Sequence, residues 1–219
     1  MRSNTVVCIG TGPSLTASQV EVARSKGFRL FVCNNAFKMA LDAELLYAVN
    51  LAWWDHYAGE VRGLRCAKWT TNREAAAKYQ LNCIRELNAP GLSTDPDVIH
   101  HGHGSGFSLV SMAYRMGAQR IVLLGYDLHY APDYDARSHN PGSSPRHFFG
   151  EYPATMVHWP SVHVKEGVHV ELLDLYQSVT DQGLVEIINC TPGSSLTCFE
   201  RRRIDDVEVE RSWCTQSGR

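Results

Sequence analysis

The chain of 219 residues has no apolar run that approaches the roughly 20 residues needed to cross a bilayer. Its first residues, MRSNTVVCIG, also lack the apolar core and the cleavage site of a secretory signal peptide. These two absences argue against a membrane-spanning or exported protein. We therefore expect a cytoplasmic protein without a membrane span.

Charge and cysteine spacing argue against two further classes. The formal net charge of −2 gives no overall basic surface, so nucleic-acid binding driven by net charge is not indicated. The seven cysteines include no CxxC pair, and Cys8 and Cys33 lie inside apolar runs. Such spacing is typical of buried, reduced thiols rather than of a disulfide framework.

The glycine-rich segment near the N-terminus lacks the marks of two common nucleotide-binding loops. A dinucleotide fingerprint needs glycine at position 15 and an acid after the second strand, but the chain has Leu15 and Asn34 there. A Walker A loop needs G-K-[ST], which does not follow. Glycines next to a helix start still allow close approach to an anionic oxygen. We predict a phosphate-binding loop made of Gly10, Thr11, Gly12, Pro13 and Ser14.

Short apolar runs alternate with helical segments, as expected for a parallel sheet with crossover helices. The predicted strands are 6–9, 28–33, 45–49, 66–69, 120–124 and 185–189, and the predicted helices are 18–26, 73–79, 107–116 and 168–182. The fold class is therefore α/β, a Rossmann-like, mostly parallel sheet flanked by helices.

A polar, proline-dotted and aromatic stretch interrupts this pattern after residue 127. A segment of this length inside a compact domain is usually functional. We therefore expect one nucleotide-binding transferase domain over residues 1–200, with a lid-like insertion at about 128–165 and a charged C-terminal tail at 201–219.

Polar residues follow the ends of several predicted strands. They are the loop 10–14, Asn34 with Asn35, Asn50, Asp127, and Asn189 with Thr191. Ligands of open parallel sheets bind at this edge, although such residues also end strands without binding anything. A carboxylate at Asp127 can accept a hydrogen bond from a hydroxyl, hold Mg²⁺, or cap the next turn.

Histidines precede the predicted helix at 107–116. His100, His101 and His103 have no cysteine or carboxylate at ligand spacing, so we interpret them as loop residues near an anion site rather than as a metal site. Ser105 is the expected N-cap of the helix, which would direct its first amides toward a ligand or only satisfy them locally.

Five segments in order resemble a known superfamily. They are CIGTGPSL, FVCNNAF, GSGFSLVSMAYRMGAQRIVLLGYDL, HFFGEYP and IINCTPGSSLTCFE. Together they resemble the bacterial lipooligosaccharide sialyltransferases, the related 6-hydroxymethylpterin diphosphokinase-like proteins and a group of phage proteins. The resemblance implies a Rossmann-like transferase with a nucleotide donor, located in the host cytoplasm if a phage encodes it.

The resemblance also assigns roles to residues. The loop 10–14 would surround the donor phosphate and Asp127 would lie at the sugar or metal side. The remaining nucleotide or phosphate contacts would be Asn34, Asn35, Ser105, Gly106, Thr191, Ser194 and Ser195. The sialyltransferase lid ends in a catalytic histidine, where this chain has Glu151. The base would then be Glu151, His147, or one of His158 and His163, or the donor is not a sialic acid.

Three functions follow from these residues. The leading one is a glycosyltransferase that uses a nucleotide-sugar donor, with Asp127, Glu151 and His147 as catalytic candidates. The second is an ATP-dependent, diphosphokinase-like enzyme that needs Mg²⁺ at Asp127. The third is a nucleotide-binding protein without catalysis. The acceptor, a glycan or a modified nucleobase, is not fixed by the sequence, which also leaves a homo-oligomer open.

Overall fold

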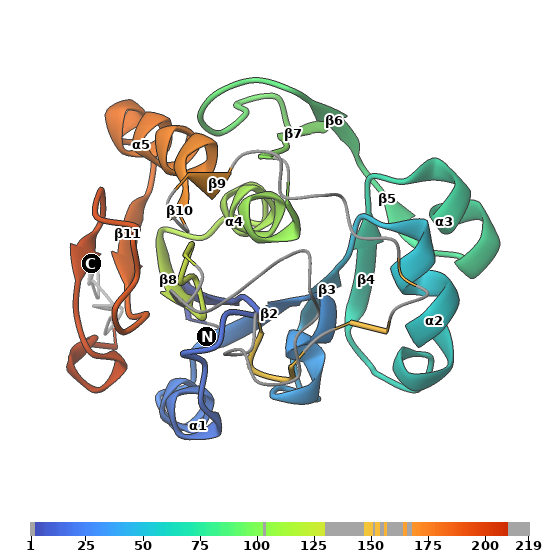
Figure 1. Ribbon diagram of the computed structural model, residues 1–219, viewed down its shortest axis with the longest axis horizontal. Coiled ribbons are helices and arrows are strands. Elements are labelled where there is room, and N and C mark those ends of the chain that lie inside the picture. The colour runs from blue at the N-terminus through green and yellow to red at the C-terminus, as the bar shows by residue number, and fades with distance from the viewer. Residues whose placement is uncertain are drawn as a thin grey trace, which may run out of the picture.

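The structure is a computed structural model, and it describes residues 3–102, 104–129, 147–150, 152–153, 156, 164–165 and 168–209. A twisted central sheet is covered by helices on both faces (Figure 1). This is the α/β, mostly parallel, Rossmann-like arrangement that the sequence predicts.

The main sheet of the described residues has eight strands in the order β12-β11-β8-β1-β2-β3-β4-β5, and all neighbouring strands in it are parallel. The strands are β1 (Thr5–Ile9), β2 (Arg29–Cys33), β3 (Leu45–Tyr47), β4 (Ala67–Thr70), β5 (Asn82–Cys83), β8 (Arg120–Leu124), β11 (Glu186–Asn189) and β12 (Glu200–Arg201). The chain runs outward from β1 in one direction through β5, and in the other through β8 to β12. The topological switch therefore lies between β1 and β8.

Helices connect the strands. They are α1 (Ala17–Ser25), α2 (Leu51–Val61), α3 (Arg73–Tyr79), α4 (Ser105–Arg115) and α5 (Val170–Gln182), with short 3₁₀ segments η1 (Asn34–Lys38) and η2 (Ile204–Asp206). Two small sheets pair β6 (Arg85–Leu87) with β7 (Val98–His100), and β9 (Val164–Lys165) with β10 (Val168–His169). No helix in the described ranges is long and apolar enough to cross a membrane.

The alternation of side chains along β1 builds two cores, one on each face of the sheet. Val7 and Ile9 pack with buried residues of α1, α2 and α3, whereas Val6 and Cys8 pack with α4 and α5. Figure 1 shows α1 and α4 on opposite sides of the sheet. Because β1 is buried on both faces, it reads as a continuous apolar run, which is typical of a central parallel strand.

Most predicted elements are present, and the differences have local causes. The predicted ranges 73–79 and 120–124 coincide with α3 and β8. Sequence reasoning missed α2, although Trp53, Trp54, Tyr57 and Val61 follow a helical period and are its buried residues. The N-cap of α4 is Gly104 rather than Ser105, which is the first helical residue.

The fold continues past residue 200, where we expected the tail to begin. Strand β12 pairs with β11, and Ile204 and Val207 are buried in the core on the α1 face. Lys26 Nζ, just after α1, donates hydrogen bonds to the carbonyl oxygens of Asp205 and Val207 at 2.6 and 2.8 Å. Residues up to Val207 therefore belong to the folded domain.

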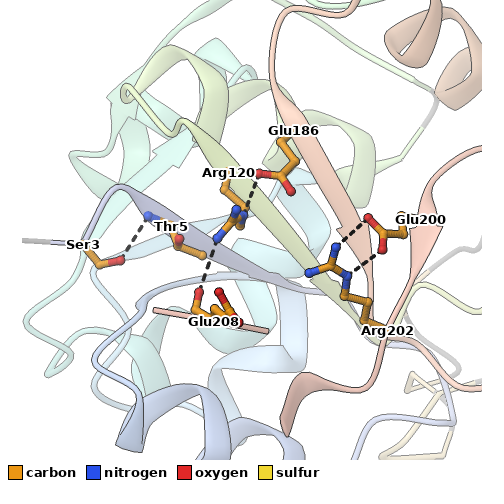
Figure 2. A network of polar contacts seen from close by, with 7 residues as sticks. All are labelled: Ser3, Thr5, Arg120, Glu186, Glu200, Arg202 and Glu208. Carbon is orange, nitrogen blue, oxygen red and sulfur yellow. Dashed lines mark hydrogen bonds and ion pairs between the residues drawn. The ribbon is translucent and has the colours of Figure 1, made fainter. Parts of the chain in front are cut away.

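Charged residues tie the amino ends of the strands together (Figure 2). Arg120, at the start of β8, donates from Nε to Glu186 Oε2 of β11 at 2.7 Å and from Nη1 to the carbonyl of Glu208 at 3.3 Å. Its side chain is 17% exposed, while the side chain of Glu186 is 44% exposed. Arg202 and Glu200 form a local, more exposed pair beside it.

Replacing Arg120 by leucine removes a cross-strand ion pair and a contact to the C-terminal segment. We expect the free energy of unfolding to fall by about 1 kcal/mol, the upper range for a partly exposed pair. The matched variant Arg202→Leu breaks only an exposed pair between near neighbours and should leave stability unchanged. Urea denaturation of both variants measures the difference, and equal losses would contradict the special role of Arg120.

Candidate functional site

The glycine loop and the end of β8 are interlocked at the topological switch. The amides of Gly10 and Gly12 donate to the carbonyl oxygens of Leu124 and Gly125 at 2.8 and 2.9 Å. A Cβ atom on Gly12 would lie 1.8 Å from Asp127 Oδ2, so only glycine fits between these loops. The structure thus brings the predicted phosphate loop and the predicted carboxylate into direct contact.

The amides of this loop serve the fold itself. In addition to those of Gly10 and Gly12, the Ser14 amide donates to Asp127 Oδ1 at 3.2 Å, and the Leu15 amide donates to the Gly12 carbonyl at 3.2 Å. We expected such amides to face a ligand phosphate. In this conformation these amides are therefore occupied by the protein, and the Ser14 hydroxyl is buried. Pro13 is exposed at the loop tip.

Asp127 and Ser14 each carry a buried polar atom with no hydrogen bond. Asp127 is 5% exposed, and neither its Oδ2 nor Ser14 Oγ meets the geometry of a hydrogen bond with the described chain. Burial raises the pKa of the Asp127 carboxyl, and the Ser14 hydroxyl and amide oppose that shift. Partnerless buried polar atoms are rare in folded proteins and call for an explanation, such as a ligand.

The loop after β11 packs against the same strand end. Thr191 Oγ1 accepts from the Tyr126 amide at 3.0 Å, and Ser194 Oγ donates to the Tyr126 carbonyl at 2.6 Å. The Ser195 amide donates to the Asp127 carbonyl at 2.9 Å. The hydroxyls of Thr191 and Ser194 thus hold the loops together, although all three residues lie where a ligand contact was predicted.

His129 is a site residue that sequence reasoning left out. Its Nδ1 lies 3.0 Å from the Asp127 carbonyl and 3.3 Å from Ser195 Oγ. Because a carbonyl only accepts hydrogen bonds, this contact favours a proton on Nδ1. Leu128 has a φ of +55°, an uncommon conformation for leucine, at the turn just before His129. Its position two residues after Asp127 was the available signal.

His147 lies on the glycine loop. Its Nδ1 is 3.1 Å from Thr11 Oγ1, and the Phe148 amide donates to the Thr11 carbonyl at 3.1 Å. The His147 ring stacks on Phe149 with centroids 5.0 Å apart and an interplanar angle of 4°. The structure therefore joins the first catalytic candidate to the predicted phosphate loop. Glu151, the second candidate, and most of the lid-like insertion lie outside the described residues.

Asn34 and Asn35 follow β2 with different surroundings. Asn35 is 1% exposed; its Nδ2 donates to Tyr57 Oη at 2.9 Å and its Oδ1 accepts from Trp53 Nε1 at 2.8 Å. This side chain is held inside the protein. Asn34 is half-buried and has a φ of +47°, a conformation that asparagine adopts more readily than most residues. Asn34 is the better placed of the two for a ligand contact.

The start of α4 also reaches the switch. Ser105 is buried, and the Gly106 carbonyl accepts a hydrogen bond from Tyr126 Oη at 3.0 Å. Tyr126 therefore connects this helix start to the β8 loop that carries Asp127.

The described donors do not fit a resident metal ion. No group of three or more histidine, cysteine, aspartate or glutamate side chains that could hold a metal gathers in the described part of the chain. Among the residues that the structure describes, Asp127 is the carboxylate at the switch, whereas Mg²⁺ needs six oxygen ligands, largely water and substrate phosphate. His100 directs Nδ1 at the carbonyl oxygens of Pro90 and Gly91, at 3.0 and 3.1 Å, which is a structural contact.

Comparison with known proteins supports the fold. No family model and no curated protein sequence matches the chain significantly. Among solved structures, it is similar to MAf glycosyltransferase from Magnetospirillum magneticum AMB-1, with a TM-score of 0.57 and 13% identity. The match covers 95% of this chain and 35% of that protein, so this chain spans about a third of its length.

A second solved structure, a candidate epimerase from Bacteroides thetaiotaomicron, matches at a TM-score of 0.30 and 12% identity over 86% of this chain and 70% of its own. A TM-score this low does not indicate a shared fold. At 13% identity the likeness to the glycosyltransferase indicates a shared fold alone. The resemblance to sialyltransferases and phage proteins has no support from a family model and stays a prediction.

Replacing Asn35 by alanine leaves the Trp53 N–H and the Tyr57 hydroxyl without this buried partner. We expect the free energy of unfolding to fall by about 2–4 kcal/mol. Asn34→Gly is the matched control, because glycine tolerates a positive φ, and it should cost little. Denaturant titration of both proteins measures the change. Similar losses at the two positions would contradict the structural role of Asn35.

The stability of the protein should also depend on the ionisation of Asp127. Its pKa is raised in the folded state, so the carboxyl carries no penalty below its ordinary value of 3.8, where both states are protonated. As the pH rises from that value through the raised pKa, the unfolded state ionises before the folded state does, and the free energy of unfolding falls. We expect Asp127→Asn to gain stability relative to the original protein between about pH 4 and pH 7, measured by urea denaturation. The opposite trend would mean that the fold stabilises the carboxylate.

Proposed function

We propose that the chain is a transferase that binds a nucleotide-sugar donor between the ends of β1 and β8 and transfers the sugar to an acceptor hydroxyl. One observation carries the proposal: Asp127 Oδ2 and Ser14 Oγ are buried at the topological switch and neither makes a hydrogen bond of good geometry, although the Ser14 hydroxyl lies close enough to lower the pKa of the Asp127 carboxyl. Ligands of this sheet type bind there. The fold likeness to a solved glycosyltransferase supports the reaction class.

The two partnerless atoms suit the polar groups of such a donor. The Asp127 carboxylate would accept a hydrogen bond from a hydroxyl of the sugar or ribose, and the Ser14 hydroxyl would donate to a phosphate oxygen. Because both atoms are covered, donor binding requires the loop 10–14 to move outward. Leaving a polar atom buried and unpaired costs about 1–3 kcal/mol, which the ligand's hydrogen bonds would offset.

The transfer step needs a base and a stabilised leaving group. The acceptor oxygen forms a bond to the anomeric carbon while the bond from that carbon to the phosphate oxygen breaks, and its electron pair leaves with the nucleotide. The acceptor proton passes to the base. His147 is the described candidate, because a proton on Nδ1, donated to Thr11 Oγ1, makes Nε2 the basic atom. Glu151 is the alternative that the sequence offers.

A donor screen tests the proposal directly. Sugar nucleotides of CMP, UDP, GDP and ADP are tested by thermal shift, and candidate acceptors are then assayed by product mass spectrometry. We expect one nucleotide class to raise the melting temperature and to yield a glycosylated product. Mg²⁺-dependent release of AMP from ATP would instead support phosphoryl transfer, and tight binding without turnover would support a non-catalytic nucleotide-binding protein.

Ser14→Ala separates binding from folding. Because Ser14 Oγ makes no hydrogen bond of good geometry in the free protein, its removal should change the melting temperature little. The same change should weaken donor binding about tenfold, since it removes a hydrogen bond to a charged phosphate. Ser18→Ala, at an exposed position of α1, is the matched control and should change neither property.

The base is assigned by comparing His147→Gln with Glu151→Gln at fixed donor concentration. Replacement of the true base should lower turnover at least about a hundredfold and should leave donor binding unchanged. Normal turnover in a protein that carries Ser14→Ala and Asp127→Asn together would overturn the site assignment.

A further inference from the structure

A cavity lies away from the switch, at the far end of the same sheet edge. Its volume is about 370 Å³, the lower end of the range for small-molecule sites. It is lined by Thr71, Arg73, Cys83, Ile84, Arg85 and Glu86. Thr71 follows the carboxyl end of β4, and Ile84 follows the carboxyl end of β5. Both strands run parallel to β1, so the cavity opens at the edge that carries Asp127.

The position is compatible with a second substrate rather than with the donor itself. Strand β4 is three strands from β1 in the sheet order, and β5 is four strands away. At a spacing of about 4.8 Å per strand, the cavity lies roughly 14–19 Å along the edge from the glycine loop. Figure 1 shows β4 and β5 at the opposite end of the sheet from β11.

The charges of the lining favour an anion. The lining residues include two arginines, Arg73 and Arg85, and one glutamate, Glu86. Arg73 forms no ion pair with the described residues. Arg85 pairs with Asp95 at 3.4 Å, but the two side chains are 60% and 50% exposed, so this pair holds Arg85 only weakly and an incoming anion can replace it. Guanidinium groups bind carboxylates and phosphates through paired N–H donors.

The other lining groups favour hydroxyls. Thr71 Oγ1 lies 3.3 Å from Tyr47 Oη, which fixes its position at the cavity wall. Glu86 adds a carboxylate that accepts hydrogen bonds from hydroxyl groups. Ile84 is buried and forms an apolar part of the lining. Arginine donors suit an anionic group, and the glutamate acceptor suits hydroxyl groups. A sugar that carries a negative group is complementary to both.

We propose that this cavity, lined by Arg73, Arg85, Thr71 and Glu86, binds a monosaccharide unit that carries a carboxylate or a phosphate. Its identification as the acceptor of the transfer rests on the function proposed above. The binding site itself does not depend on that function, because it contains none of the residues placed at the switch.

Three matched sugars test the binding site. Glucose, glucuronate and glucose 6-phosphate differ only at the sixth carbon, and ligand-observed NMR titration of the full chain measures their affinities. We expect one or both acidic sugars to bind at least about tenfold more tightly than glucose. Preference for glucuronate would identify a carboxylate ligand, and preference for the phosphate would identify a phosphorylated one.

Variants distinguish a site from general charge attraction. Arg73→Gln combined with Arg85→Gln should abolish the preference for acidic sugars. Arg62→Gln, an exposed arginine at the end of α2, is the matched control and should preserve it. Equal affinity for the three sugars, or an undiminished preference in the double variant, would overturn the proposal.

The exposed Cys83 supplies an independent measurement, because its thiol lines the cavity. The preferred acidic sugar should slow alkylation of Cys83 by iodoacetamide, read by peptide mass spectrometry, and should not slow alkylation of Cys66. Absence of protection at Cys83 would also count against the site.

Donor binding, measured by thermal shift, should be the same in the double arginine variant as in the original protein. Failure of this proposal and failure of the proposed function therefore give different results.

Discussion

The contact between Gly12 and Asp127 is the constraint on which the candidate site depends. A side chain at position 12 would occupy the space of the carboxylate, and the Ser14 amide fixes the other carboxylate oxygen. This contact joins the loop after β1 to the loop after β8, the two strands that flank the topological switch. The same packing that closes the loops leaves one buried carboxylate oxygen and one buried hydroxyl without a hydrogen bond of good geometry. The fold therefore stores an unfavourable polar arrangement where ligands of such sheets bind.

A second set of contacts builds outward from this pair. Thr191 and Ser194 attach the loop after β11 to Tyr126, and Tyr126 in turn contacts the start of α4 through Gly106. Thr11 brings His147 to the other side of the glycine loop. Three strand ends and one helix start thus meet through hydrogen bonds between backbone and small hydroxyl side chains. These contacts hold the chemically competent residues, Asp127, His129 and His147, around one region.

The sequence predicted the sheet better than it predicted the roles of the site residues. Buried parallel strands such as β1 and β8 can be predicted because both of their faces are apolar, which gives a continuous apolar run in the sequence. Glycine at positions 10 and 12 likewise predicts that another group approaches the backbone closely. The helix α2 was missed because its buried face is made of tryptophan and tyrosine beside polar residues, although its spacing is helical.

Side-chain roles depend on distant partners that the sequence does not place. The neighbours Asn34 and Asn35 are the same residue type, yet Asn35 is committed to Trp53 and Tyr57 from another element. The sequence suggested that the loop amides bind phosphate, but three of them donate instead to two carbonyl groups and one carboxylate that tertiary packing brings close. The cavity near Arg73 was not foreseen, because its lining combines the ends of two strands and a small separate sheet.

The pairing of β1 with β8 has a consequence for how the molecule assembles. A hydrogen bond from Asn4 to Gln119 closes a separation of 115 residues beside that pairing. Local contacts form early in folding, whereas pairings across such separations require a large loss of chain entropy first. Strands β1 to β5 occupy one continuous half of the chain, but the switch does not exist until β8 has been added. During synthesis, the first hundred residues can therefore build a sheet edge but not the region around Asp127, which makes the site a late product of folding.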